Sequence, residues 1–169
     1  MEAITKDAMN GSVASAARIA SPEERASMLD VLNRHDRAVS DQDVAKILQT
    51  FHPDAFFEAK PIGLRATSLE SIAEIYRRTM TPLSESFLAR RQLREWTNQK
   101  GVVREWQYPV TVAPGLRFAT RQLEIFEFSD DLLRILARRI RMSESYAGIY
   151  AAALGSDIAA AKDVIRVPG

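Results

Sequence analysis

The chain changes its hydrophobic pattern part-way along its length. Up to about residue 80, apolar residues recur every three or four positions, which is the spacing of an amphipathic helix. After about residue 100, apolar and polar residues alternate over long stretches, as in strands with one buried face. Helices first and then a series of long strands predict an α+β fold.

The first predicted helix begins at Ser21–Glu24, where a capping serine precedes a proline and two acids. Its apolar stripe contains Met28, Leu32, His35 and Val39. Asp36 lies at the edge of the same stripe. This helix therefore carries a histidine and a carboxylate at or beside its buried face.

Two shorter helices are predicted next. A capping box at Ser40–Asp43 opens the first of them, and the His-Pro-Asp turn at residues 52–54 ends it. A second capping box at Thr67–Glu70 opens the other, which Pro82 ends. The short aromatic segment between these helices, residues 55–59, predicts a strand.

The second half of the chain predicts four long strands separated by turns. Their expected bounds are residues 87–97, 102–112, 116–128 and 132–142. Proline cannot donate a backbone hydrogen bond, so we expect an edge or a bulge at Pro109. An alanine-rich helix over residues 147–162, interrupted at Gly155, is expected after the strands.

Size and composition fit one domain. The chain has 169 residues, of which 46% are hydrophobic, and this is ample for a single core. We expect one domain over residues 21–163, a disordered tail over residues 1–20 and a C-terminal tail over residues 164–169.

Charge and cysteine content exclude several classes of function. Lys plus Arg number 23 and Asp plus Glu number 22, so no basic field favours nucleic-acid binding. We interpret arginine clusters such as Arg90-Arg91 and Arg138-Arg139 as solvated faces. The absence of cysteine excludes disulfides and thiolate chemistry. No apolar run approaches the roughly 18 residues of a membrane span, so a cytoplasmic protein without nucleic-acid or membrane partners is predicted.

Two stretches resemble a known family, namely LNRHDRAVSDQDVAKILQTFHPDAFFEAKPIG at residues 32–63 and LEIFEF at residues 123–128. Over about residues 25–145 the chain is similar to the SnoaL-like branch of the nuclear transport factor 2-like superfamily. This branch is related to ketosteroid isomerases, polyketide cyclases and limonene epoxide hydrolases. The resemblance implies a cone-shaped, curved mixed sheet wrapped around the N-terminal helices and enclosing a pocket. It also implies a hydrophobic small-molecule substrate and a homodimer.

The ketosteroid isomerase pattern can be followed residue by residue. The tyrosine of its first helix falls at His35, and its second oxyanion donor falls at Glu124. Its proton-abstracting aspartate falls at Ala59, so the usual base is absent. Asp36 is one way to replace that base. SnoaL-type cyclases carry an aspartate near the place of Arg138 or Arg139.

The resulting hypothesis assigns His35, Asp36 and Glu124 as catalytic residues. His35 would move the proton, steered by Asp36, and Glu124 or Arg138 would stabilise the developing oxyanion. The predicted substrate-binding residues are Phe57, Tyr76, Trp106, Tyr108, Phe126 and Arg138. Other interpretations stay open: His35 as a core histidine, Asp36 paired with Arg34 or Arg37, and the aromatic residues as core. Burial could raise the pKa of Glu124 and keep it neutral, or Glu124 could pair with Arg138.

The leading functional hypothesis is a cofactor-independent acid–base enzyme that acts on a polyketide- or terpenoid-like molecule. The reaction would be an isomerisation, a cyclisation or a dehydration, and two distant histidines predict no metal site. Epoxide hydrolysis and a non-catalytic binding module of the same fold are alternatives. A dimeric scaffold that binds protein partners through Arg90, Arg91 and Arg94 is a third.

Overall fold

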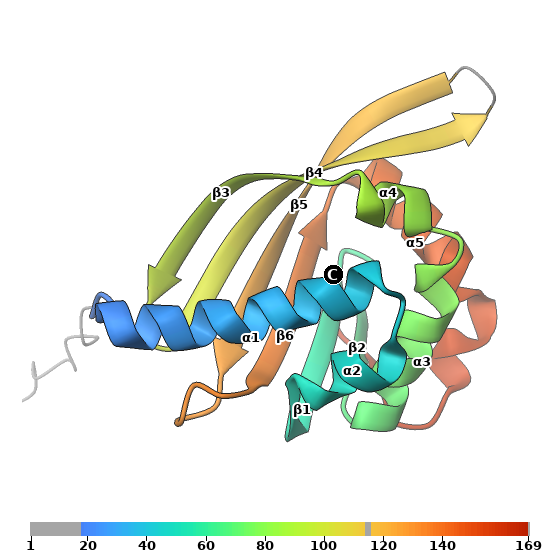
Figure 1. Ribbon diagram of the computed structural model, residues 1–169. Coiled ribbons are helices and arrows are strands. Elements are labelled where there is room, and N and C mark those ends of the chain that lie inside the picture. Colours follow the sequence, from blue (N-terminus) through green and yellow to red (C-terminus); the bar gives the residue numbers. More distant parts are fainter. Residues whose placement is uncertain (1–17, 114–115, 169) are drawn as a thin grey trace, which may run out of the picture.

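A computed structural model describes residues 18–113 and 116–168 (Figure 1). Residues 1–17, most of the predicted N-terminal tail, lie outside the described residues. The elements, in chain order, are α1 (Pro22–Ser40), α2 (Val44–Gln49), β1 (Phe51–Lys60), β2 (Leu64–Ala66), α3 (Leu69–Met80), α4 (Ser84–Leu88), β3 (Arg91–Asn98), β4 (Gly101–Ala113), β5 (Leu116–Phe128), β6 (Ile135–Met142), α5 (Glu144–Leu154), a 3-10 helix η1 (Ser156–Ala160) and β7 (Val164–Arg166).

The strands form one curved, open sheet in the order β3-β4-β5-β6-β1-β2-β7. All neighbours are antiparallel except β1 and β6, which are parallel, so the sheet is mixed. Figure 1 shows α1 running across the strands on one side of the sheet, with α2, α3 and α4 near its far end. The predicted α+β architecture, a curved mixed sheet wrapped around N-terminal helices, is confirmed.

Helix α1 begins at the predicted cap. The Ser21 hydroxyl accepts a hydrogen bond from the Glu24 backbone N–H, and the Glu24 carboxylate accepts one from the Ser21 N–H. These bonds satisfy two donors that the first turn of a helix otherwise leaves free. The buried residues of α1 are Met28, Val31, Leu32, His35, Ala38 and Val39. The stripe places His35 toward the sheet.

The second helix is shorter than predicted. Its cap is Asp43 itself, whose carboxylate accepts from the Lys46 N–H, and not Ser40. Strand β1 already starts at Phe51, because Phe51 pairs with Ile135 of β6 before the register shifts further along. Pairing with a distant strand therefore decides a boundary that the local His-Pro-Asp signal misplaces.

Three other boundaries also differ from the expectation. Helix α3 is capped by Ser68, and not by Thr67, because the Ser68 hydroxyl accepts from the Ser71 N–H. The strand expected over residues 87–97 begins only at Arg91, because residues 87 and 88 belong to α4. Residues 164–166 are not a tail: they form β7, which pairs with β2 and is the edge strand on that side of the sheet.

The long strands β4 and β5 extend beyond their neighbours as a two-stranded arm (Figure 1). Strand β3 pairs with β4 only as far as Gln107, so β4 has a free edge at Pro109. This confirms the edge predicted from that proline, which has no N–H to donate. The Ser86 hydroxyl of α4 donates to the Pro109 carbonyl at 2.8 Å and holds α4 against the base of the arm.

The core lies between the inner face of the sheet and helices α1 and α3. Its fully buried members include Met28 and Leu32 of α1, Ile72 of α3, and Phe51 and Phe57 of β1. Side chains from consecutive helices and from several strands share this core.

Truncation of the core at α3 is expected to destabilise the protein markedly. Ile72 is 0% exposed, so Ile72→Ala should lower the free energy of unfolding by about 2–5 kcal/mol through lost burial and the cavity left behind. The control is Leu133→Ala, at a side chain that is 57% exposed, which should change it by no more than about 0.5 kcal/mol. Chemical denaturation measures both, and equal effects would contradict this assignment of the core.

Candidate functional site

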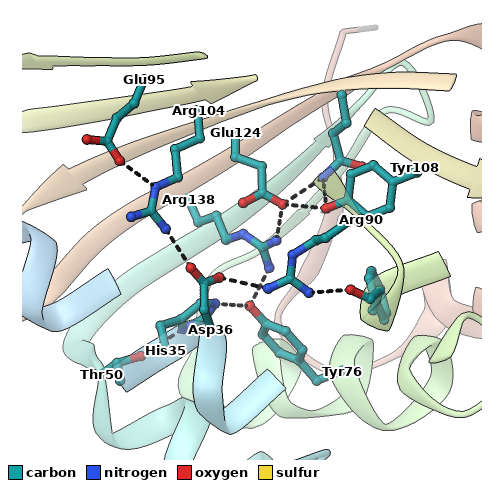
Figure 2. A network of polar contacts seen from close by, with 12 residues as sticks. His35, Asp36, Thr50, Tyr76, Arg90, Glu95, Arg104, Tyr108, Glu124 and Arg138 are labelled. Carbon is teal, nitrogen blue, oxygen red and sulfur yellow. Dashed lines mark hydrogen bonds and ion pairs between the residues drawn. The ribbon is translucent and has the colours of Figure 1, made fainter. Parts of the chain in front are cut away.

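Charged and polar side chains from several elements meet on the inner face of the sheet (Figure 2). Alternation along the strands places them there, because residues two apart in a strand share a face. The register sets Arg104 of β4 opposite Glu124 of β5, and Phe126 of β5 opposite Arg138 of β6. A buried charge is costly unless it is paired and hydrogen-bonded, so the pairings determine what this site can do.

Glu124 receives three hydrogen bonds on one carboxylate oxygen. Its Oε1 accepts from Arg138 at 2.7 Å, from the Gln122 amide at 2.8 Å and from the Tyr108 hydroxyl at 3.2 Å. Burial alone would raise the pKa of Glu124, but the positive charges of Arg138 and Arg90 outweigh it and hold the pKa below its ordinary value. The hypothesis that burial keeps Glu124 neutral is therefore wrong, and the alternative pairing with Arg138 is the one found.

Arg138 is held from two sides. Its Nη1 donates to the Tyr76 hydroxyl and its Nη2 donates to Glu124. The guanidinium carbon also lies 5.3 Å from the ring centre of Phe57 and 5.7 Å from that of Phe126. The third nitrogen of the guanidinium, Nε, is buried and has no hydrogen-bond partner within the described part of the chain. The interpretation of Arg138 as part of a solvated face is therefore wrong.

His35 lies deep in the interior, with only 1% of its surface exposed. Its Nδ1 is 2.9 Å from the Thr50 hydroxyl, and its Nε2 is 3.0 Å from the Tyr76 hydroxyl. Burial lowers the pKa of His35 well below its ordinary value, and the positive charge of Arg138 adds to this effect. The imidazole is neutral near neutral pH, and both its nitrogens are already hydrogen-bonded.

Asp36 faces a different set of groups from its neighbour on α1. Its carboxylate accepts from Arg90 at 3.0 Å and from Arg104 at 2.6 Å, and not from the arginines of its own helix. Its side chain is 26% exposed. Burial raises the pKa of Asp36 above its ordinary value, although Arg90 and Arg104 oppose the rise. Of the two carboxylates that line the cavity, Asp36 is thus the one that takes up a proton more readily.

Arg90 and Arg104 connect Asp36 to the rest of the site. Arg90 also donates to the Phe87 carbonyl at 2.8 Å, so it bridges α1 and the end of α4. Its guanidinium carbon lies 4.9 Å from the ring centre of Trp106. The Arg90 side chain is only 10% exposed, so the interpretation of this arginine as a solvated surface residue is wrong.

A small cavity remains between these side chains. The space open to the centre of a water-sized sphere measures ≈ 10 Å³, which is room for about one water molecule. The lining residues are His35, Asp36, Val39, Tyr76, Thr79, Phe87, Arg90, Tyr108, Gln122, Glu124, Arg138, Ile140 and Tyr150. The cavity is therefore small and has several charged side chains in its lining, whereas the resemblance leads one to expect room for a hydrophobic molecule.

The structure brings most of the predicted site residues together. All three residues predicted to be catalytic line the cavity, as do Tyr76, Tyr108 and Arg138. The other three predicted substrate-binding residues, Phe57, Trp106 and Phe126, are buried but are not among its lining residues. The ring of Trp106 lies against the guanidinium group of Arg90, and the rings of Phe57 and Phe126 lie against that of Arg138.

Sequence reasoning left out several residues that complete the site. Arg104 alternates with Trp106 and Tyr108 along β4, so strand periodicity could have placed it on the inner face. Arg90 and Thr50 carry no such signal, because each follows a short helix and reaches the site only through the tertiary fold. Arg90 is a more important omission than Thr50, since it is, with Arg104, a direct partner of Asp36.

Two features are absent from the described part of the chain. Among residues 18–113 and 116–168, no group of three or more His, Asp or Glu side chains is arranged to hold a metal ion. No helix in the same described part is both long and apolar enough to cross a membrane.

Comparison with solved structures assigns the fold. A steroid delta-isomerase from Pseudomonas aeruginosa matches with a TM-score of 0.61 and 16% identity, over 85% of this chain and 97% of that one. An NTF-2 like protein from Burkholderia xenovorans matches with a TM-score of 0.56 and 14% identity, over 71% and 85% of the two chains. The chain has the nuclear transport factor 2-like fold. The fold that the sequence motifs predicted is thus confirmed.

A third structure of this fold is TerC co-crystallised with polyporic acid. It matches with a TM-score of 0.57 and 14% identity, over 73% of this chain and 97% of that one. No family model matches the sequence, and no curated protein matches it significantly. At these identities, the similarity to the solved structures concerns the fold alone.

The buried pair of Glu124 and Arg138 is expected to be strongly coupled. Removing either partner alone leaves an unpaired buried charge, so Glu124→Leu or Arg138→Met should lower the free energy of unfolding by about 3–5 kcal/mol. The double variant should lose much less than the sum of the two. A matched control is Arg139→Met, whose pair with Glu127 is more exposed and should contribute no more than about 1 kcal/mol. Additive single effects in chemical denaturation would contradict the coupling.

The stability of the protein should fall as the pH falls below about 6.5, the ordinary pKa of histidine. The folded-state pKa of His35 is lowered, so the unfolded chain takes up a proton there that the folded chain does not. The expected slope approaches about 1.4 kcal/mol per pH unit. Asp36 has the opposite sign, because its raised pKa lets the folded state take up a proton first.

The comparison of two variants isolates the histidine contribution. In denaturation curves between about pH 7.5 and 5.5, His35→Gln should remove most of the slope. His52→Gln, which changes a side chain outside the site, should retain it. Equal slopes in wild-type protein and His35→Gln would show that His35 does take up a proton in the folded state.

Proposed function

We propose that this protein is an enzyme that moves a proton next to a carbonyl group of a small oxygenated molecule, without a cofactor. Isomerisation, aldol-type cyclisation and dehydration all share this step. The observation that carries the proposal is the Asp36 carboxylate, which lines the cavity, has a raised pKa and lies between two arginines. A base works best when its pKa approaches the operating pH.

Asp36 accepts the substrate proton in this proposal, in place of the aspartate that Ala59 replaces. Before the reaction, the negative charge resides on Asp36 and is paired with Arg90. After proton transfer it resides on the substrate oxygen, as an enolate. Arg90 and Arg138 both line the cavity and are placed to stabilise that oxygen. The step moves a charge within the site and leaves the number of charges unchanged.

The balance of charges favours a neutral substrate. Each inward-facing arginine already has a carboxylate partner: Arg138 pairs with Glu124, and Arg90 with Asp36, while Arg104 bridges Asp36 and Glu95. A ligand that arrives as an anion would add a charge without a partner, whereas a neutral ketone would not. The arginines in the lining favour a molecule that places a carbonyl oxygen beside them, with any apolar part against the aromatic side chains.

Substrate entry requires side chains to move, because the cavity holds about one water molecule. Arg90 is the group best placed to move. It joins α1 to the short helix α4 through its bonds to Asp36 and to the Phe87 carbonyl. A substrate oxygen that pairs with Arg90 would replace the first of these bonds and open the space beside α4.

The similar structures support the proposal. One is named a steroid delta-isomerase, which favours an isomerisation, and another was co-crystallised with an organic acid, polyporic acid. Both facts belong to those proteins. Here they favour a small organic substrate over a macromolecular one.

Asparagine at position 36 is expected to abolish proton transfer. Exchange of α-hydrogens of a steroid 3-ketone or of 2-hydroxycyclohexanone, both neutral ketones, for deuterium, followed by NMR, detects the step without knowledge of the final product. Asp36→Asn should slow enzyme-dependent exchange by at least about 100-fold, because an amide cannot accept the proton. The control is Asp30→Asn on the same helix, at a side chain that is 70% exposed and paired only with Arg34. Unchanged exchange in Asp36→Asn would remove Asp36 from the mechanism.

The second candidate function is a non-catalytic binding module. The small volume of the cavity and the complete pairing of its charges favour it. The same NMR experiment separates the two candidates. A wild-type protein that binds the ketones but exchanges no hydrogens would favour the binding module.

The homodimer implied by the resemblance stays a prediction. The helices lie on one side of the sheet (Figure 1), and its other face carries the partly exposed side chains of Trp96 and Leu123. One chain has a mass of 18.9 kDa, and light scattering should give twice that mass. A Trp96→Glu variant should then be monomeric, because a charge at an apolar contact is costly. A monomeric wild-type protein would contradict the prediction.

A further inference from the structure

The hydrogen bonds around His35 can each be given a direction. The Thr50 hydroxyl lies 2.6 Å from the Ile47 carbonyl oxygen, and a carbonyl can only accept, so Thr50 donates its one proton there. The Thr50 oxygen must then accept from His35 Nδ1, at 2.9 Å. His35 therefore carries its proton on Nδ1.

The other end of the chain of bonds leads to the same assignment. Arginine has only donors, so the Tyr76 oxygen accepts from Arg138. The Tyr76 proton is then directed to His35 Nε2, at 3.0 Å, which is unprotonated in a neutral ring that carries its proton on Nδ1. The order of donation is Arg138 to Tyr76, Tyr76 to His35, and His35 to Thr50 (Figure 2).

The surroundings of His35 oppose a second proton on the ring. A proton on Nε2 would leave the Tyr76 hydroxyl with two donors directed at it and no acceptor for its own proton. Positive charges reach the ring from Arg138 on β6, Arg104 on β4 and Arg90 after α4. The two carboxylates nearby, Asp36 on α1 and Glu124 on β5, are engaged with these arginines.

The same chain of bonds fixes the Arg138 side chain. Nη1 is used by Tyr76 and Nη2 by Glu124, which leaves Nε as the buried donor without a partner in the described residues. Arg138 lines the cavity. We propose that His35 is a positioning residue that, through Tyr76, holds the Arg138 guanidinium so that its Nε–H binds a ligand oxygen in this cavity.

A second free group indicates the class of ligand. The Gln122 amide donates from Nε2 to Glu124, which leaves its Oε1 as a buried acceptor without a partner in the described residues. Gln122 also lines the cavity. One unpaired donor and one unpaired acceptor suit a ligand with a carbonyl oxygen and a hydroxyl hydrogen, such as a hydroxy ketone or the enol of a diketone. This part rests on the proposed function, whereas the tautomer of His35 does not.

The first experiment determines the tautomer. The chain has two histidines, so a His52→Gln protein labelled with ¹⁵N shows the ring signals of His35 alone. Long-range ¹H–¹⁵N spectra should show a protonated Nδ1 and an unprotonated Nε2 from about pH 7.5 to about pH 5. A proton on Nε2, in either the neutral or the charged ring, would overturn the proposal.

The second experiment tests the positioning role, with 2-hydroxycyclohexanone, a neutral hydroxy ketone, as the probe. The Arg138 Nε–H signal, assigned by its loss in Arg138→Lys, should shift on addition of the hydroxy ketone to wild-type protein. His35→Leu, which leaves Tyr76 without an acceptor, should weaken binding at least about tenfold. His35→Gln, which can still accept from Tyr76, should restore most of it. Equal binding by wild-type protein and His35→Leu would overturn the positioning role.

Thr50→Val provides a second variant if His35→Leu does not fold. It removes the acceptor of the Nδ1 proton with little change in shape, so binding should weaken, whereas Tyr76 still donates to Nε2 and keeps the ring proton on Nδ1. Binding by Thr50→Val as tight as by wild-type protein would overturn the positioning role. The absence of an Arg138 Nε–H shift in wild-type protein would contradict the ligand-binding role. Binding of the hydroxy ketone through Arg138 without any hydrogen exchange would contradict the proposed enzyme and leave this inference standing.

Discussion

The pairing of Arg138 with Glu124 is the constraint on which the rest of the interior depends. An arginine on the inner face of a sheet must have its charge compensated, and the neighbouring strand supplies the carboxylate. The guanidinium then has donors left over, one of which engages Tyr76 and through it His35. One ion pair between β5 and β6 thereby orders side chains on two helices as well.

This arrangement gives different surroundings to Asp36 and Glu124, the two carboxylates that line the cavity. Glu124 is tied to Arg138 and remains an anion, so it serves to hold that arginine. Asp36 lies nearer to solvent and has the raised pKa, so it can exchange a proton. Two acids in one pocket acquire different tasks because their surroundings move their pKa values in opposite directions.

The sequence predicted the fold better than the site. Helical and strand periodicity identified α1, α3 and the long strand β5, because each carries a regular pattern over many residues. Boundaries set by distant pairing were misplaced: Phe51 joins β1 through Ile135, and residues 164–166 join the sheet through β2. No local pattern reports such contacts.

The same distinction holds for the candidate site. Asp36 and Glu124 could be predicted because they stand in or beside apolar rows of regular elements. Arg90 could not, because a charged residue after a short helix usually points to solvent. Arg90 is buried because it donates both to the Phe87 carbonyl in α4 and to the Asp36 carboxylate of α1. The ion pairs beside the cavity were likewise hidden, since their partners lie on separate elements of the fold.

The parallel contact between β1 and β6 has a consequence for the growing polypeptide. Strand β1 leaves the ribosome early, but its partner on one side is among the last strands to be made. Until β6 emerges, the edge of β1 has no hydrogen-bonding neighbour there, and the arginine on β6 that organises the interior does not yet exist. Such long-range pairing slows folding, so nearly the whole chain must be synthesised before the central strands can join.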